Sequence, residues 1–277
     1  MSRIVLALFA FALCSIARAQ NNSGPALREI VEASRTNLPA ALALCDKAVS
    51  AHPTNTQPLL LRARLLARER RYEDGVRDLT VALALDPKAA EIYQERGELN
   101  FKAGHFKDSV ADFDRVIELA PAQAAHHWQR GISLYYARRF SDGRKQFELH
   151  QTVNPNDVEN AAWHFLCVAR ESGVTNARVA MLKAGEDARV PMREIDALYR
   201  GSGSIERVLD AATRAASGTR GREAMFYAHL YLGLYFDVLG DAPKAREHIG
   251  KAAGEFSGEH YMGDVARVHL RYLKTSL

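Results

Sequence analysis

The chain has 277 residues, 47% of them hydrophobic and 25% charged, and a formal net charge of +4. This length and composition allow one elongated repeat domain or two compact domains with a sizeable core. The small positive charge argues against nucleic-acid binding, because phosphate binding usually shows as a clustered basic face, and three cysteines are too few for a disulfide framework.

Residues 1–19 have the order of a secretory signal peptide. Arg3 is followed by an apolar run of 13 residues, 4–16, and by the small-x-small triplet 17–19. A membrane-spanning helix needs about 20 apolar residues, so we expect cleavage after Ala19 and no stable transmembrane segment afterwards. Acylation of Cys14 is the alternative, but the residue before it is not small and the one three before it is not leucine. We therefore expect an exported protein, periplasmic or secreted.

A period of 34 residues organises the next part of the chain. Four prolines, Pro53, Pro87, Pro121 and Pro155, are separated by 34, 34 and 34 residues. Small, aromatic and large apolar residues recur with the same spacing. These positions are Ala63, Gly97 and Gly131; Tyr72, Phe106 and Phe140; Cys45, Leu79, Phe113 and Phe147; and Ala41, Gly75, Ser109 and Gly143. A period of this length predicts stacked helix pairs.

Each of these residue types suits a helix pair. Small side chains let two antiparallel helices approach closely, while the large ones fill the space between repeats. Each proline should end the second helix of its pair, because it lacks an N–H and restricts the residue before it. Residues 71–87 resemble the second half of a tetratricopeptide-repeat (TPR) motif. We therefore predict four TPR repeats in residues 24–155, within an all-α helix-turn-helix solenoid.

Residues 156–222 break the repeat register and are expected to form a divergent helical segment. Asn156 or Asp157 is the candidate N-cap of its first helix and Ser204 that of its last, since short polar side chains accept hydrogen bonds from free helix N–H groups. The expected helices span residues 157–170, 175–184, 191–199 and 205–216.

Residues 223–277 are predicted to form a final TPR-like repeat and a capping helix. Gly233, Phe236 and Ala245 match the motif, although Ser257 stands where proline would be. The helix expected over residues 259–274 would cover the last exposed apolar face, which a stacked array requires.

Two segments are similar to the NlpI-like family of bacterial envelope TPR lipoproteins. They are the central repeat, residues 130–136 with the exit 154–157, and the last repeat, residues 231–241. The resemblance implies a homodimeric scaffold that brings envelope proteases and cell-wall hydrolases together. Because the lipobox of the family is missing here, we expect a periplasmic adaptor without a lipid anchor.

In a TPR stack the first helix of each pair lines the concave groove, so its exposed side chains are candidates for binding proteins or peptides. We expect the aromatic ones to anchor a partner, because rigid aromatic residues often dominate interface energies, and the arginines to steer acidic groups. The alternative is that some of the aromatic residues pack under the next helix. The candidates are Arg64, Arg68, Glu98, Phe101, Trp128, Ile132, Tyr135 and Tyr136.

Catalytic and metal sites are weakly indicated. Cys45 and Cys167 are expected to be buried small hydrophobic residues, with a single bridge between them as the alternative. His164 and Cys167 lie three residues apart on one predicted helix and could form a nucleophile–base pair, but no third orienting group is identifiable. The histidines do not gather, so we expect no metal and no cofactor.

These observations favour a non-catalytic protein-interaction scaffold in the bacterial envelope. A weak Cys–His hydrolase and a self-assembling structural subunit are the alternatives.

Overall fold

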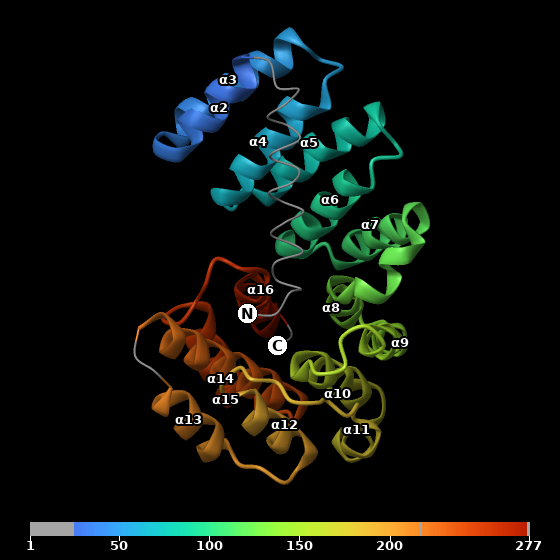
Figure 1. Ribbon diagram of the computed structural model, residues 1–277, viewed down its shortest axis with the longest axis vertical. Helices are drawn as coiled ribbons and strands as arrows, with labels where there is room; N and C mark the ends of the chain where they lie inside the picture. Colours follow the sequence, from blue (N-terminus) through green and yellow to red (C-terminus); the bar gives the residue numbers. More distant parts are fainter. Residues whose placement is uncertain (1–24, 216–217, 276–277) are drawn as a thin grey trace. The chain divides into compact units, whose positions relative to one another are not determined.

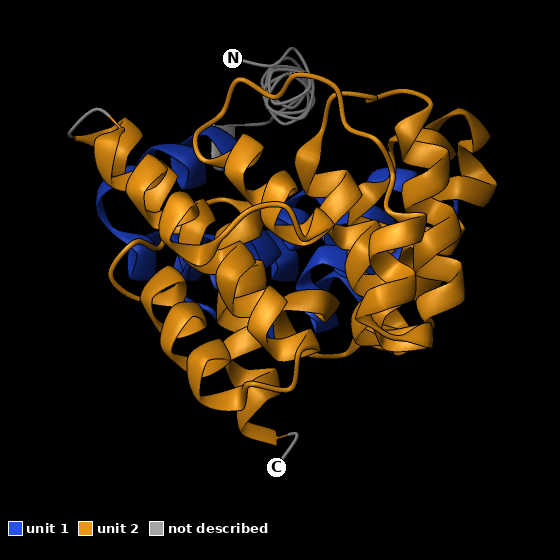
Figure 2. Ribbon diagram, turned by 90° about the horizontal axis from the view of Figure 1, so that it is seen from below, with its two compact units in different colours: residues 1–99 blue, residues 100–277 orange. Residues whose placement is uncertain are grey.

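The computed structural model describes residues 25–215 and 218–275, and all regular elements within these ranges are helices (Figure 1). The expected signal peptide lies outside the described residues. No described helix combines the length and apolar character needed to cross a membrane. The chain divides into two compact units, Met1–Leu99 and Asn100–Leu277, called unit 1 and unit 2 below (Figure 2).

From residue 25 onward, unit 1 contains two helix pairs and most of a further helix. Asn37 and Asn55 begin α3 and α4, because their side chains accept hydrogen bonds of 3.0 Å from the backbone N–H groups of Ala40 and Gln57. The helices are α2 (Pro25–Thr36), α3 (Leu38–Ala51), α4 (Thr56–Arg68), α5 (Tyr72–Leu85) and α6 (Ala90–Ala103), the last of which continues into unit 2.

Unit 2 continues with helices that pack against their neighbours in the chain. They are α7 (Phe106–Leu119), the 3-10 helix η1 (Pro121–His126), α8 (Trp128–Tyr136), α9 (Phe140–Gln151), α10 (Val158–Ser172), α11 (Val174–Ala180), α12 (Met192–Arg200), α13 (Ile205–Arg214), α14 (Thr219–Val238), α15 (Ala242–Ala253) and α16 (Tyr261–Thr275). The all-α prediction, including its terminal helix, is confirmed.

The prolines of the 34-residue period mark equivalent helix ends. The first three stand two residues after the ends of α3, α5 and α7. The residues that follow these helices, His52, Asp86 and Ala120, have φ values of −134°, −133° and −139°, and each donates a backbone hydrogen bond to the residue four positions before it. The fourth proline differs, because α9 ends four residues before Pro155.

Small residues of the period lie where helices approach closely. A Cβ atom added to Gly75 would lie 3.2 Å from the carbonyl oxygen of Ala63 in α4. One added to Gly131 would lie 2.6 Å from the ring of Phe147. Because packed interiors leave no space for such atoms, these positions require small residues. This interpretation of the period is confirmed.

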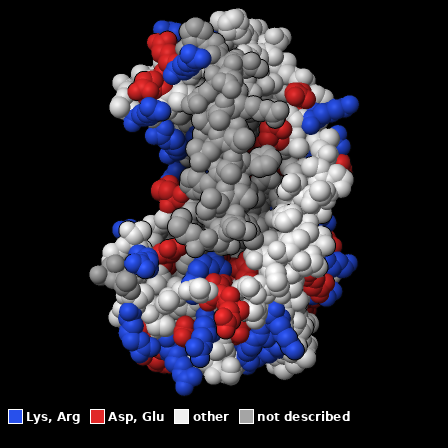
Figure 3. Space-filling model, in the orientation of Figure 1, with Lys and Arg blue, Asp and Glu red and all other residues white. Residues whose placement is uncertain are grey.

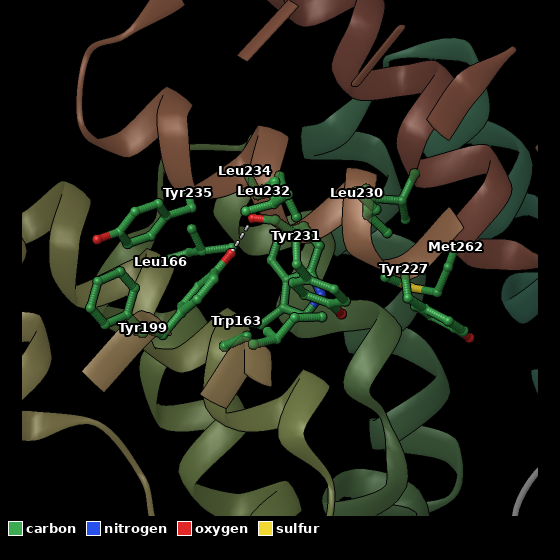
Figure 4. Packing of buried hydrophobic residues seen from close by; sticks show 14 of the residues in the cluster. Trp163, Leu166, Tyr199, Tyr227, Leu230, Tyr231, Leu232, Leu234, Tyr235 and Met262 are labelled. Atoms are coloured by element: carbon green, nitrogen blue, oxygen red, sulfur yellow. Dashed lines mark hydrogen bonds between the residues drawn. The ribbon is translucent and has the colours of Figure 1, made fainter. Parts of the chain in front are cut away.

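The core of unit 2 is rich in aromatic residues, and its centre lies among α10, α12 and α14 (Figure 4). Trp163, Tyr199 and Tyr231 are almost fully buried, one from each of these helices. The Tyr199 hydroxyl donates a hydrogen bond of 2.8 Å to the Tyr231 carbonyl oxygen, so its polar atom is satisfied in the interior (Figure 4).

The divergent segment follows the predicted caps but not all the predicted lengths. Asp157 and Ser204 are the N-caps of α10 and α13. The helix expected over residues 175–184 ends at Ala180, and residues 181–191 form a strap without helix. The prediction was wrong because other elements bind the strap backbone. The Gln151 side chain donates to the Lys183 carbonyl oxygen at 2.8 Å, and Arg200 donates to that of Leu182 at 2.7 Å.

Candidate binding surfaces

Four of the predicted groove residues lie in the core of unit 2. Phe101, Ile132, Tyr135 and Tyr136 have exposed fractions of 0%, 1%, 3% and 4%. The expectation that they are exposed is therefore wrong, and the alternative that they pack under a neighbouring helix is correct for them. Counting along the motif assumed an open groove, whereas this one is filled.

The filling element over Phe101 and Tyr136 is the terminal helix α16. The ring of Tyr261 stacks on Phe101 with centroids 5.4 Å apart, and a hydrogen bond of 2.9 Å joins the Tyr136 hydroxyl to Nδ1 of His269. Trp128, the remaining aromatic candidate, is half-buried, and its ring meets Tyr261 edge to face at 5.1 Å. The predicted capping helix thus contacts Phe101, Trp128 and Tyr136, whereas Tyr135 packs against Phe140 and Trp163.

The three charged candidates form a polar surface on unit 1. Arg64 and Arg68 are exposed on α4, and Glu98 is half-buried on α6. Arg64 donates two hydrogen bonds from Nε to the carboxylate of Glu95, at 3.0 and 3.2 Å, and a further short one from Nη2. We call Arg64, Arg68, Glu95 and Glu98 the α4–α6 face.

Two further contacts of this face lie within unit 1. Arg68 donates a hydrogen bond of 2.8 Å to the carbonyl oxygen of Ser34 in α2, and the Gln94 side chain donates one of 2.9 Å to Glu98. Burial would lower the pKa of Arg64, but the hydrogen bonds and charge of Glu95 raise it overall, so this side chain stays charged. The face can therefore offer both positive and negative groups to a ligand.

Charged side chains of both signs are intermixed on the described part of one face of the molecule. Figure 3 shows Lys and Arg next to Asp and Glu in each unit, on the face turned to the viewer, without a broad area of one sign. Such a surface suits pairwise charge contacts with a partner better than long-range attraction of a polyanion.

The cysteines are structural. Cys45 and Cys167 are buried and free, so the prediction of two buried residues is confirmed and the bridge is excluded. Burial raises the pKa of Cys45 to about 12. It also raises the pKa of Cys167. His164 directs Nε2 toward Glu148, 3.5 Å away, and burial lowers its pKa. Because the thiolate is the nucleophilic form, these side chains do not support the Cys–His hydrolase.

An ion cluster around the exposed side chain of Arg189 was not predicted from the sequence. Arg189 of the strap binds Asp157 and Asp187 with contacts of 2.9 and 2.6 Å and also pairs with Glu159. The Tyr231 hydroxyl donates a hydrogen bond of 2.7 Å to Glu159. This cluster fastens the strap to the start of α10. No short motif signals it, because the partners lie about 30 residues apart in the divergent segment.

Comparison with known proteins supports the repeat architecture. Residues 60–124 match the family described as Tetratricopeptide repeat, and no curated protein matches. A tetratricopeptide repeat protein from Parabacteroides merdae is similar in structure, with 14% identity, a TM-score of 0.56, and coverage of 91% of this chain and 100% of that chain. MamA from Desulfovibrio magneticus RS-1, residues 41 to the end, is 17% identical, with a TM-score of 0.50 and coverage of 56% and 90%. The chain thus has an all-α tetratricopeptide-repeat fold.

Proposed function

We propose that this chain is a non-catalytic adaptor that binds partner proteins or peptides through the α4–α6 face of unit 1. The observation that carries the proposal is that Arg64, Arg68 and Glu98 remain on the surface of a repeat stack, whereas the aromatic candidates are covered. TPR folds commonly use the first helices of their repeats for recognition.

The chemistry of the face indicates a partner segment with charged groups. Arg64 already presents its guanidinium group to the carboxylate of Glu95, with the geometry that a partner carboxylate would use. A bound acidic side chain would take over these donors and leave Glu95 for a basic group of the partner. We therefore infer a ligand segment that carries acidic and basic side chains close together.

We further propose that the adaptor works in the bacterial envelope as a periplasmic or secreted protein. The signal-peptide pattern of residues 1–19 and the resemblance to the NlpI-like family support this location. The same resemblance suggests envelope proteases or cell-wall hydrolases as partners, and a homodimer as the working form. Cell fractionation and the mass of the mature chain test export, because cleavage after Ala19 would leave Gln20 as the first residue.

Binding is tested by affinity capture from the native envelope, followed by a measured dissociation constant with each retained protein. The double variant Arg64→Ala and Arg68→Ala should bind at least about tenfold more weakly, since charge-assisted hydrogen bonds contribute about 1.5–3 kcal/mol each. The matched control, Arg35→Ala with Arg77→Ala, removes the same charge from exposed positions of unit 1. Equal binding by both double variants, with unchanged helicity, would disprove the role of the face.

A further inference from the structure

The aromatic inner side of unit 2 already holds a helix. Residues Phe101, Trp128 and Tyr136, called the aromatic face here, contact Tyr261 and His269 of α16. The aromatic ring of Tyr272 also meets Tyr136, edge to face at 5.7 Å. The structure thus shows one helix bound on the side that TPR proteins use for ligands.

Polar contacts at the last turn of α6 fix the position of α16. Nζ of Lys102 lies 3.1 Å from a carboxylate oxygen of Asp264, and Arg271 donates a short hydrogen bond to the Lys102 carbonyl oxygen. Lys102 and Arg271 are 169 positions apart in the chain. The helix is therefore held by a specific set of contacts and not by apolar burial alone.

The packing of α16 leaves some buried side-chain nitrogen atoms without a hydrogen bond. Nε of Arg267 is buried without a hydrogen-bond partner, and Nε2 of His269 makes no hydrogen bond, although it lies 3.5 Å from the Asp237 carboxylate. A buried polar atom without a partner offsets part of the gain from apolar burial. Residues 254–260, which join α15 to α16, form no helix, so α16 can leave without unwinding a repeat.

We propose that the aromatic face is a binding site for an amphipathic helix of a partner protein, and that α16 occupies this site until the partner replaces it. The proposal rests on the adaptor function but concerns a different unit. The resident helix defines the ligand chemistry. Tyr261, His269 and Tyr272 stand at positions i, i+8 and i+11, which lie on one side of a helix. Asp264, at position i+3, supplies the carboxylate for Lys102.

The test uses the full chain and a fluorescent peptide with the sequence of residues 259–277 as the competing helix. The variant Asp264→Ala with Arg271→Ala removes both contacts to Lys102 and should bind the peptide at least about tenfold more tightly than the unchanged chain. Lys274→Ala, at an exposed position of α16, is the matched control and should bind as the unchanged chain does. Fluorescence anisotropy measures each affinity.

A second variant fixes α16 in place. Lys102→Cys with Asp264→Cys, joined by a short bifunctional maleimide, should lose peptide binding, whereas the same variant before crosslinking should retain it. No peptide binding by the loosened chain, or equal binding after crosslinking, would overturn the proposal. A loosened chain that forms dimers would also overturn it, by assigning the site to α16 of a second copy. Changes to Arg64 and Arg68 should leave peptide binding unaltered, so the two proposals fail separately.

Discussion

Acidification from pH 7 to pH 4 should destabilise unit 2 through its buried histidines. Burial lowers the pKa of His127, His229 and His269 from 6.5 to about 4 in each case. Their exposed fractions are 6%, 4% and 0%, so solvent screening is slight. The ring of His127 packs against Phe113 at a tilt, with centroids 4.7 Å apart, and His229 shares a hydrogen bond of 2.8 Å with a second buried histidine. None of these positions stabilises an imidazolium enough to offset the loss of water.

The magnitude follows from the pKa shifts. A pKa unit corresponds to 1.36 kcal/mol, so a shift from 6.5 to about 4 amounts to about 3 kcal/mol for each histidine. Above pH 6.5 the three histidines are neutral in both the folded and the unfolded chain. Their full contribution to the free energy of unfolding is then present. As the pH falls from 6.5 to about 4, only the unfolded chain takes up protons, so stability decreases. Below about pH 4 the folded form is protonated too, and the loss levels off.

Fewer groups have pKa shifts that stabilise the folded form in acid. Burial raises the pKa of Asp157 and Glu159, so the folded form gains protons there and partly offsets the loss in acid. Three histidines at about 3 kcal/mol each still approach the whole free energy of unfolding of a typical domain, about 5–15 kcal/mol. Unit 1 contains a single histidine, His52, which is exposed. Acid should therefore act mainly on unit 2.

The assay can separate the two units. Both tryptophans of the chain, Trp128 and Trp163, lie in unit 2, so their fluorescence reports this unit, whereas circular dichroism reports all helices. Urea titrations at several pH values should show the fluorescence transition moving to lower urea between pH 6.5 and pH 4. The variant His229→Gln should reduce the pH dependence. A fluorescence midpoint that stays constant across this range, or that falls mainly above pH 7, would refute the reasoning.

Further predictions concern packing, the strap and the thiols. Gly131→Ala should lower the free energy of unfolding by about 1–3 kcal/mol through overpacking, whereas Gly250→Ala, where the added atom meets nothing within 4 Å, should raise it by up to about 1 kcal/mol in urea titrations. Arg189→Ala should cost about 1–2 kcal/mol, because it removes the cation from three partly buried carboxylates but is itself screened by solvent. Arg193→Ala, an exposed control, should cost less than about 0.5 kcal/mol; equal losses would argue against the ion cluster. Cys45 and Cys167 should react with a disulfide reagent only after unfolding, so rapid labelling of either residue in the native Cys14→Ser variant would contradict their burial.

The sequence was sufficient for features set by local rules. The proline period predicted helix ends at three corners. Ser204 was predicted as a cap, and the α10 cap was narrowed to Asn156 or Asp157, because capping depends on a residue and its near neighbours. The place of α16 could not be predicted in this way. Tyr136 and His269 are 133 positions apart, and the motif of each repeat is compatible with an open or a filled groove.

The exposure of the candidate binding residues was predictable only in part. Arg64 and Arg68 remain exposed because both lie on α4, the first helix of its pair, on the side away from α5. The burial of Phe101 and Tyr136, in contrast, depends on a segment that does not follow the repeat. The Arg189 cluster also depends on that segment, because its carboxylates come from the start of α10 and from the strap itself.

The break in the repeat and the aromatic face are connected. An uninterrupted stack keeps its first helices open along one side and leaves its last helix beside the last repeat alone. In unit 2 the divergent helices α11–α13 and the strap intervene, and α16 contacts both its neighbour α15 and the residues Phe101 and Tyr136. Aromatic residues on the inner side form the core against which α16 packs, and in our proposal they also anchor a partner helix that replaces α16. A chain with polar residues at these positions would lose both the packing of α16 and the proposed helix-binding site. We therefore propose that unit 2 regulates binding and that the charged face of unit 1 selects the partner.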